Sequence, residues 1–304
     1  MGVAAAGIPE RCLQLEGSRP RPAAAGGKLA DLLTSGLPRL RDVPFTLAHP
    51  AAILPLVRRP LVASALVAGA VAPDLLYLDP IYRFATQGIN GNFTLTLTHK
   101  LSSALWLDPL LALILLVAFT VVVQRPLLAL APAGLAARLP TPSLRVPSTA
   151  VVLWTVVSAM IGALTHVLWD SFTHYDGYFV LRYHSFFTAQ VTGAWDVNRI
   201  LQYVSTVGGC LVLAIWLYRW YRRVDPQSVA GEDHVPPWVR YVVLAAMVLI
   251  GLAGDVVQLS RTDLVGEAVA RSVLTGVASG CLAALAWYVV LWHLFRLRRR
   301  VAAL

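Results

Sequence analysis

Three side chains that commonly bind metals follow one another at intervals of four residues near the end of a long apolar run. In the stretch GALTHVLWDSFTHYDG, residues 162–177, they are His166, Asp170 and His174. Four residues of an α-helix turn through about 400° and rise about 6 Å, so neighbours in this series share a helix face and can hold one ion. Eight residues rise about 12 Å, which is too far for one ion. His166 and Asp170 are therefore candidate ligands of one metal. His174 is a candidate for a second metal, a substrate or proton transfer.

Two more candidates flank other apolar segments. Asp74 follows Pro73 at the end of one segment, and His99 precedes the next. The alternative is a set of ordinary turn, interfacial and hydrogen-bonded helix-end residues. However, an ionisable group in hydrocarbon costs about 2.5–3.5 kcal/mol even on lenient scales, and such groups are usually paired and functional. Two imidazoles and two carboxylates at one membrane face suit zinc, with manganese, iron or magnesium as alternatives.

The elements that position these residues are predicted to be membrane helices. Of 304 residues, 57% are hydrophobic and 13% charged, against about 45–50% and about 25% in a soluble domain. Backbone groups in lipid must bond within their own segment, and the runs lack the alternation of a membrane barrel. The predicted fold is an all-α, polytopic transmembrane bundle of about six helices. The six apolar segments are 61–78, 105–123, 149–169, 200–218, 239–258 and 272–295.

The basic residues indicate orientation rather than a nucleic-acid partner. The net charge of +9 comes mostly from arginines that flank the apolar segments, which is the pattern of membrane orientation and not of a binding stripe. The loops 125–148 and 219–240 and the tail from 296 are richer in arginine than the loops between them. This predicts a multi-pass cell-membrane protein with both termini in the cytoplasm. The three cysteines include no CxxC pair, which argues against a disulfide framework or a cysteine zinc site.

Composition divides the chain into four parts. Residues 1–42 are rich in Ala, Gly, Pro and Arg without a sustained period, which predicts a disordered extension or a start site placed too early. Residues 43–220 form a membrane domain with the candidate metal site, and 221–238 a cytoplasmic linker. Residues 239–304 supply two further membrane helices and a basic tail.

Five short stretches resemble a known family. They are PFTLAHPAAILPL at 44–56, VAPD at 71–74, TH at 98–99, GALTHVLWDSFTH at 162–174 and ILQYVSTVGG at 200–209. Together they are similar to DUF4184, a bacterial family of uncharacterised integral membrane proteins, over roughly residues 43–220. The order of His, PD, TH and HxxxD also resembles the membrane-bound metal-dependent hydrolases of the DUF457 group and, more remotely, zinc-dependent phospholipase C.

The resemblance implies a set of site residues. The implied metal ligands are His49, Asp74, His99, His166 and Asp170. The resemblance also implies His174 as a further residue of the site. Gln202 and Ser205 match a polar pair of the family and either face the same cavity or bond between helices. Lys100 stands where the hydrolases have Ser or Thr, which weakens a hydroxyl role and suits an anionic head group. A six-helix count puts His49 on the opposite side from Asp74, unless 46–58 and 61–73 form a short helical hairpin.

The leading hypothesis is a membrane-embedded, metal-dependent hydrolase that acts on an amphiphilic ester or phosphoester, with membrane lipid as its partner. Asp170 or Asp74 would be a ligand or a base, and His174 would protonate the leaving group. No GxSxG nucleophile signature appears, which favours metal-activated water. One alternative is a metal-dependent lyase or cyclase acting on a prenyl diphosphate, although Mg²⁺ prefers oxygen ligands to histidine. The other is a transporter or a non-enzymatic membrane protein, although the duplicated halves of many transporters are absent.

Overall fold

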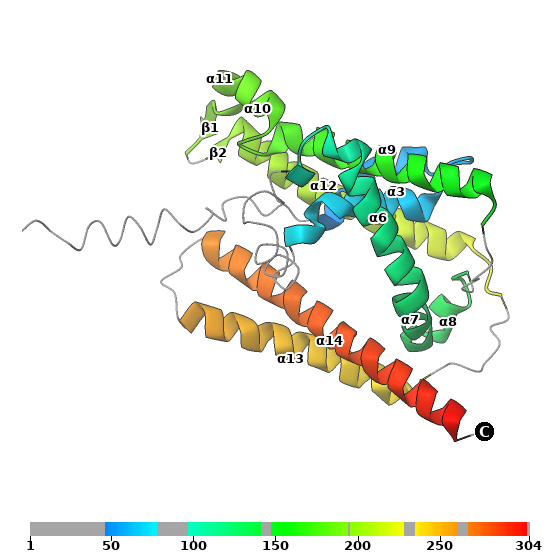
Figure 1. Ribbon diagram of the computed structural model, residues 1–304. Helices are drawn as coiled ribbons and strands as arrows, with labels where there is room; N and C mark the ends of the chain where they lie inside the picture. Colours follow the sequence, from blue (N-terminus) through cyan, green and yellow to red (C-terminus); the bar gives the residue numbers. More distant parts are fainter. Residues whose placement is uncertain are drawn as a thin grey trace, which may run out of the picture. The chain divides into compact units, whose positions relative to one another are not determined.

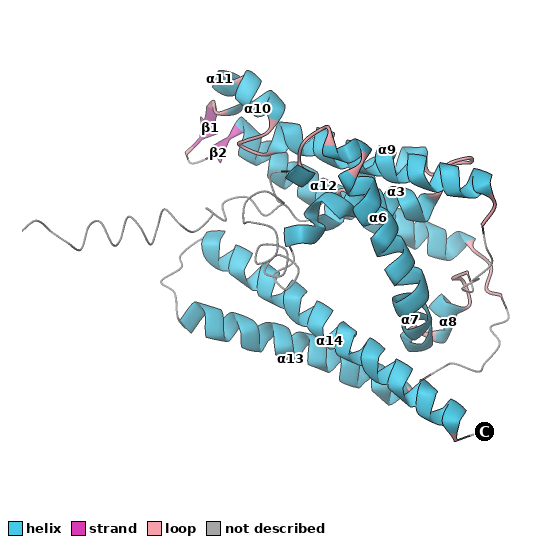
Figure 2. Cartoon of the chain, viewed as in Figure 1, coloured by secondary structure: helices cyan, strands magenta, loops and turns pink. Residues whose placement is uncertain are grey.

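The computed structural model describes residues 46–77, 97–140, 147–193, 195–227, 235–260 and 267–302. These residues belong to one compact unit, Val43–Leu304, and nearly all their regular elements are helices (Figure 1, Figure 2). Within them, β-structure is limited to an antiparallel pair, β1 (Gln190–Thr192) and β2 (Trp195–Asp196). The predicted all-α class is confirmed. The predicted N-terminal extension 1–42 lies outside the described residues, as do residues 228–234 of the predicted linker.

Five stretches of the described chain are long and apolar enough to cross a membrane, which confirms a polytopic membrane fold. The first contains α6 (Leu107–Ala118), the π-helical η5 (Phe119–Val123) and α7 (Gln124–Leu130), which is followed by a short α8 (Ala133–Ala136). The others are built on α9 (Thr149–Thr173), α12 (Val197–Arg223), α13 (Pro237–Ser260) and α14 (Glu267–Val301). The remaining predicted segment, 61–78, is a shorter apolar helix over Ala63–Leu76.

The chain before α6 forms the helical hairpin that His49 requires. The first arm consists of η1 (Thr46–Ala48), α2 (Pro50–Ile53) and η2 (Leu54–Leu56). The second arm consists of α3 (Ala63–Val71) and the 3₁₀-helix η3 (Ala72–Tyr77). Ile53 of the first arm packs in one core cluster with Leu66 and Ala70 of the second. At the turn, the Val62 N–H donates to the Ser158 hydroxyl of α9 at 2.9 Å. The hairpin therefore lies against α9.

Glycines allow α3 and α9 to pack almost backbone to backbone. A Cβ atom on Gly69 of α3 would overlap the carbonyl oxygen of Ala159, and a Cβ atom on Gly162 of α9 would overlap that of Leu66. Small residues at such positions are the usual means by which membrane helices approach closely. His166 lies one helical turn beyond Gly162. The close approach therefore brings its ring against the backbone of α3.

The chain between α9 and α12 folds back over the end of α9. It holds α10 (Tyr178–Arg182), α11 (His184–Phe187) and the β1–β2 pair, which lie together at one end of α9 in Figure 1. Phe179 of α10 stacks on Phe172 of α9 with ring centroids 4.2 Å apart, and Phe187 of α11 is buried. This segment adds structure at the end of α9 that carries His166 and Asp170.

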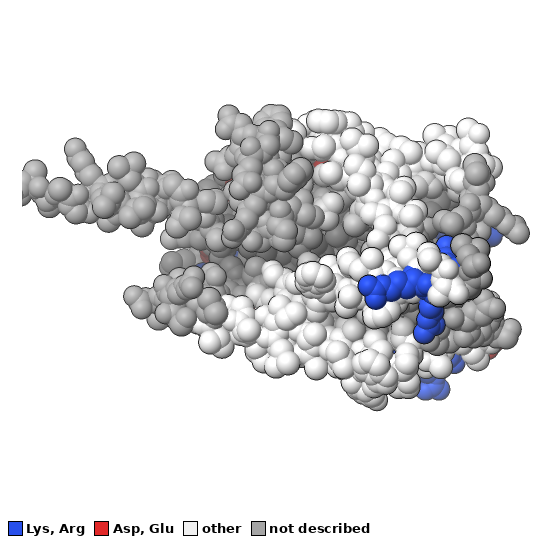
Figure 3. All heavy atoms as spheres, turned by 60° about the horizontal axis from the view of Figure 1, so that its bottom comes forward, with Lys and Arg blue, Asp and Glu red and all other residues white. Residues whose placement is uncertain are grey.

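The last two helices, α13 and α14, pack on each other and against α7. Val243, Tyr288 and Val289 form a core cluster to which Val123 and Leu130 contribute. Polar contacts support the packing, because the Tyr288 hydroxyl donates to the carbonyl oxygen of Pro126 at 2.9 Å. On the face drawn in Figure 3, most Lys and Arg side chains gather toward one end of the molecule. The last turn of α14 adds Arg298, Arg299 and Arg300.

Candidate metal centre

Four of the predicted ligands lie together in the structure. Asp74 comes from η3, His99 from the turn at 97–100, and His166 and Asp170 from α9. One ligand atom from each lies within 4.8 Å of the others. Asp74, His166 and Asp170 are buried, and His99 is partly buried. Residues separated by up to 96 positions along the chain thus form one candidate metal site.

The separations between these atoms match those of ligands that share an ion. His166 Nε2 lies 3.0 Å from Asp170 Oδ2 and 3.5 Å from Asp74 Oδ1. His99 Nε2 lies 3.3 Å from Asp74 Oδ1 and 3.5 Å from Asp170 Oδ2. Zinc binds nitrogen and oxygen at about 2.0–2.2 Å, so two ligands of a tetrahedral ion lie about 3.3–3.5 Å apart. The four His–Asp pairs therefore have about the spacing of ligands that share a small divalent cation, and all four donors lie within 4.8 Å of one another.

Local structure aims each side chain inward. Asp74 follows Pro73, which has no N–H for an α-helical hydrogen bond, and the chain changes there from the α-helix α3 to the 3₁₀-helix η3. His166 and Asp170 share a face of α9 because they are four residues apart. His99 lies in a turn beside Thr98, whose hydroxyl is 3.1 Å from His99 Nδ1. Side chains from a 3₁₀-helix, an α-helix and a turn therefore converge on one point.

A hydrogen bond at Nδ1 determines which nitrogen of His166 is free to bind a metal. His166 Nδ1 is 2.7 Å from the carbonyl oxygen of Ala70, an acceptor, so Nδ1 carries the proton and donates. In the neutral ring, Nε2 then presents a lone pair. The same arrangement, with Nδ1 donating to a backbone carbonyl, fixes the orientation of metal-binding histidines in many proteins.

Buried atoms of the cluster lack hydrogen-bond partners among the described residues. They are His166 Nε2, Asp74 Oδ2, Asp170 Oδ1, Asp170 Oδ2 and His49 Nδ1. Buried polar groups are normally satisfied, and a lone pair that faces carboxylate oxygens is repelled unless a cation or a proton lies between them. Two imidazole nitrogens and two carboxylates suit zinc, and they also suit manganese or iron. The residues present therefore fit a divalent metal.

His49 joins the cluster through the hairpin. Its ring stacks on that of His166 with centroids 3.8 Å apart, and its Nε2 lies 3.4 Å from Asp170 Oδ1. Burial, aided by the neighbouring His166, lowers the pKa of His49 to about 4. The ring is then neutral at physiological pH, which is the form that binds metals. The structure therefore places His49 beside Asp170, on the same side of the fold as Asp74.

His174 also lies against Asp170. The helix α9 ends at Thr173, and His174 adopts an extended backbone at its C-terminal cap. The ring is buried with Nδ1 3.4 Å from Asp170 Oδ1. The turn that follows requires Gly177, because a Cβ atom there would lie 2.7–2.9 Å from three backbone oxygens. His174 thus lies beside Asp170, from which it is four residues away, at the point where the helix ends.

Sequence reasoning missed a further buried carboxylate. Asp108, in the first turn of α6, is fully buried and accepts a hydrogen bond from Ser103 at 3.2 Å. Its Oδ1 has no hydrogen-bond partner in the described part of the chain. The signal was present, because LWLDPLL places a carboxylate in an apolar run nine residues after His99. Lys100, by contrast, is exposed beside His99.

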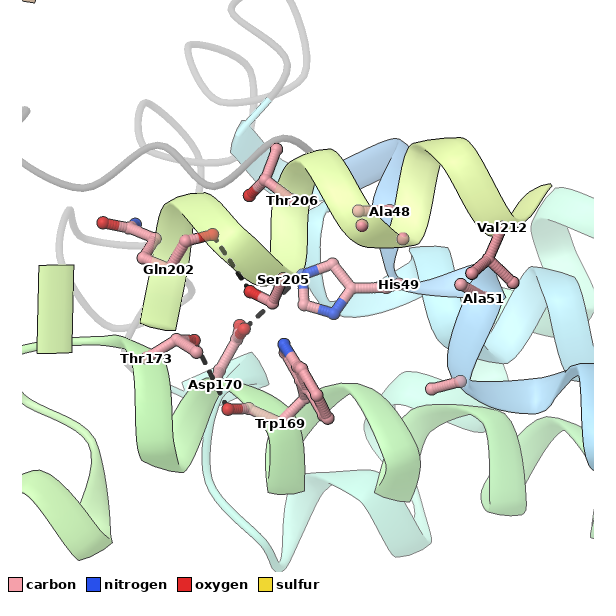
Figure 4. Close-up of a pocket in the computed structure, with 13 residues that line it drawn as sticks. Ala48, His49, Ala51, Trp169, Asp170, Thr173, Gln202, Ser205, Thr206 and Val212 are labelled. Carbon is pink, nitrogen blue, oxygen red and sulfur yellow. Dashed lines mark hydrogen bonds and ion pairs between the residues drawn. The ribbon is translucent and has the colours of Figure 1, made fainter. Parts of the chain in front are cut away.

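A cavity of about 330 Å³ opens beside the cluster. Figure 4 shows Asp170 and His49 on its wall, with side chains of α12 opposite them. Gln202 and Ser205, the polar pair singled out in the sequence, both line it. The remaining lining residues come from the hairpin, α9 and α12: Ala48, Ala51, Ala52, Trp169, Thr173, Thr206, Gly208, Gly209 and Val212.

Comparison with known proteins identifies a family. The model of a family described as "Domain of unknown function (DUF4184)" matches residues 43–290. The match covers more than the 43–220 range seen in the sequence motifs, and it includes α13 and most of α14. No curated protein and no solved structure matches the chain.

Proposed function

The chain belongs to the DUF4184 family, and we propose that it is a membrane-embedded, metal-dependent hydrolase. One observation carries the proposal: nitrogen and oxygen atoms of four side chains converge at ligand spacing, and several of them have no hydrogen-bond partner among the described residues. The four side chains are Asp74, His99, His166 and Asp170. Zinc suits this donor set best, and manganese or iron would fit less selectively. Magnesium is disfavoured by the imidazoles.

The residues around the centre can supply the metal site, the proton acceptor and the proton donor that hydrolysis requires. A divalent ion held there would polarise an ester or phosphoryl oxygen and lower the pKa of water. Asp170 contacts both the cluster and the cavity, so its carboxylate can accept a proton from water that enters the cavity. His49 lies against that carboxylate, with its Nε2 3.4 Å from Asp170 Oδ1. His174 can take up that proton from Asp170 at Nδ1, 3.4 Å from Asp170 Oδ1, and return it through the same carboxylate to the leaving group.

The position of the centre favours an amphiphilic substrate. His166 and Asp170 lie within about 12 Å of the end of α9, and the cavity runs between helices long and apolar enough to cross a membrane. A substrate that approaches from the bilayer can bring an ester or phosphoester to the centre without leaving lipid. Membrane lipid is therefore the proposed partner, and nothing in the arginine distribution calls for nucleic acid.

The proposal predicts metal-dependent ester or phosphoester cleavage by the purified full chain. We expect release of nitrophenol or fatty acid from a nitrophenyl ester, a bis-nitrophenyl phosphate or a phospholipid in mixed micelles. Activity should need added zinc, stop with a chelator and be lost in Asp170→Ala. His184→Ala is the matched control, because His184 is exposed on α11 and bonds within its own turn to Thr188. Metal binding without cleavage of any of these compounds would favour a transporter or a structural role.

We propose that the centre lies at the non-cytoplasmic face. Arg222 and Arg223 end α12, and arginines end α14, so the positive-inside tendency places those ends in the cytoplasm. The hairpin begins and ends beside the cluster, so it does not itself cross the membrane. The five crossings that follow would put Thr46 and the end of α14 on opposite sides of the membrane. The predicted cytoplasmic N-terminus stays a prediction, because residues 1–45 lie outside the described chain.

Reporter fusions test this orientation. A reporter fused after Pro140 should be active in the cytoplasm, and one fused after Thr188 should be active outside it. The reason is that α9 separates the two points and is long and apolar enough to cross the membrane. Activity of both reporters in the same compartment would rule out the proposed orientation.

A further inference from the structure

The cavity beside the centre has a polar end and an apolar end. At the polar end, Asp170, His49 and Thr173 face Gln202 and Ser205. Figure 4 shows Gln202 and Val212 at opposite ends of the part of α12 that lines the cavity. Ten residues of helix separate these two positions, which corresponds to about 15 Å. The cavity is therefore an elongated slot, and hydrogen-bonding groups are concentrated at the end near the metal centre.

The apolar end is built from very small residues. Its lining includes Ala48, Ala51 and Ala52 of the hairpin and Gly208 and Gly209 of α12. A Cβ atom on Gly209 would lie 3.0 Å from the carbonyl oxygen of Ala48, so this glycine allows α12 to approach the hairpin. A Cβ atom on Gly208 would meet nothing within 4 Å. Gly208 therefore faces open space in the slot, and a bulky side chain there would occupy that space.

We propose that this slot holds one hydrocarbon chain of a membrane lipid, with the head group at Asp170. The occupant follows from the walls: α9 and α12 lie in stretches that are long and apolar enough to cross a membrane, and the far end of the slot offers only aliphatic and backbone surface. The volume of about 330 Å³ is within the range of about 300–1,000 Å³ typical of ligand pockets. The inference rests on the proposed function and defines its substrate class as a lipid that presents a single chain.

Photolabelling of the full chain tests the slot directly. The probe is a monoacylglycerol with a diazirine at the end of its chain, added to the protein in nanodiscs. We expect labels to concentrate on Ala48–Ala52 and Gly208–Val212. Gly208→Phe should reduce labelling there at least about tenfold, since hydrophobic pockets discriminate by that factor over a single methylene. Gly254→Phe is the matched control, because Gly254 also has nothing within 4 Å of a Cβ atom and lies on α13 outside the slot.

The labelling result is separable from the metal chemistry. Labelling measures binding alone, so it should persist in His166→Ala protein even though hydrolysis is lost. Uniform labels along the whole exposed face of α12, unchanged by Gly208→Phe, would show surrounding bilayer lipid only and would overturn the slot without affecting the metal centre. Slot labelling by the probe with no hydrolysis of any ester would support a lipid site and reject its role as a substrate subsite.

Discussion

Replacing His166 with alanine should empty the metal centre. We expect wild-type protein, purified in detergent and dialysed against trace zinc, to hold about one equivalent per chain, and His166→Ala to hold almost none. His166 Nε2 is the most deeply buried donor and lies 3.0 and 3.5 Å from the two carboxylates. Loss of even an outer partner of a metal ligand typically costs about 10–100-fold in affinity, so loss of a ligand should exceed about 100-fold. Elemental mass spectrometry of the purified chain measures this directly.

Two further variants separate metal binding from folding. His184→Ala removes an exposed imidazole and should keep its metal. Asp74→Asn preserves the shape of a buried side chain while removing its charge, so it should lose metal even if His166→Ala proves unstable. Gel filtration and circular dichroism show whether each variant is folded. If the folded variants retain the wild-type metal content, or if wild-type protein binds none, the cluster is a hydrogen-bonded network and not a metal centre.

Much of the centre could be predicted because its signals are local. The four-residue spacing of His166 and Asp170 fixes their shared face on any regular α-helix. Asp74 and His99 are adjacent to apolar segments, and the alternation of crossings brings such ends to one face. The all-helical class follows from the same hydropathy, since backbone in lipid must satisfy its own hydrogen bonds. These predictions needed no knowledge of how helices pack.

What could not be predicted depends on contacts between distant segments. His49 reaches Asp170 because the hairpin folds against α9, and that packing depends on Gly69 and Gly162. Without knowledge of that contact, segment 61–78 looks like a sixth crossing. The resemblance to other sequences implied His49, and a six-helix count put it on the opposite side from Asp74 unless 46–58 and 61–73 formed a hairpin, which is the arrangement in the structure. Packing that involves small residues leaves no strong hydropathy signal, because glycine and alanine are common throughout membrane helices.

The end of α9 is a second feature that hydropathy and regular helix geometry do not fix. Helix rise alone puts His174 about 12 Å from His166 for as long as the helix stays regular. In the structure the helix ends at Thr173, and the His174 ring turns back to Asp170. The four-residue spacing therefore brings both His166 and His174 to Asp170, while the residue at which the helix ends is the part that sequence reasoning fixes least well.

Replacing His174 with alanine should slow hydrolysis while leaving the metal in place. His174 Nδ1 lies 3.4 Å from Asp170 Oδ1, and Asp170 lines the cavity, so a proton can pass between the ring and the cavity through that carboxylate. General acid–base groups typically contribute about 10²–10⁴-fold, so turnover should fall by that factor. Turnover of the metal-loaded enzyme and metal content are measured on the same preparation of His174→Ala.

The variant His174→Gln distinguishes proton transfer by the His174 ring from positioning of the Asp170 carboxylate. Glutamine can donate a hydrogen bond to Asp170 but cannot exchange a proton near neutral pH, so a proton-transfer role predicts that His174→Gln is as slow as His174→Ala. Recovery of wild-type turnover with glutamine would mean that His174 only positions the carboxylate. Loss of metal from both variants would make His174 a ligand, and unchanged turnover in both would leave it a buried packing residue at the end of α9.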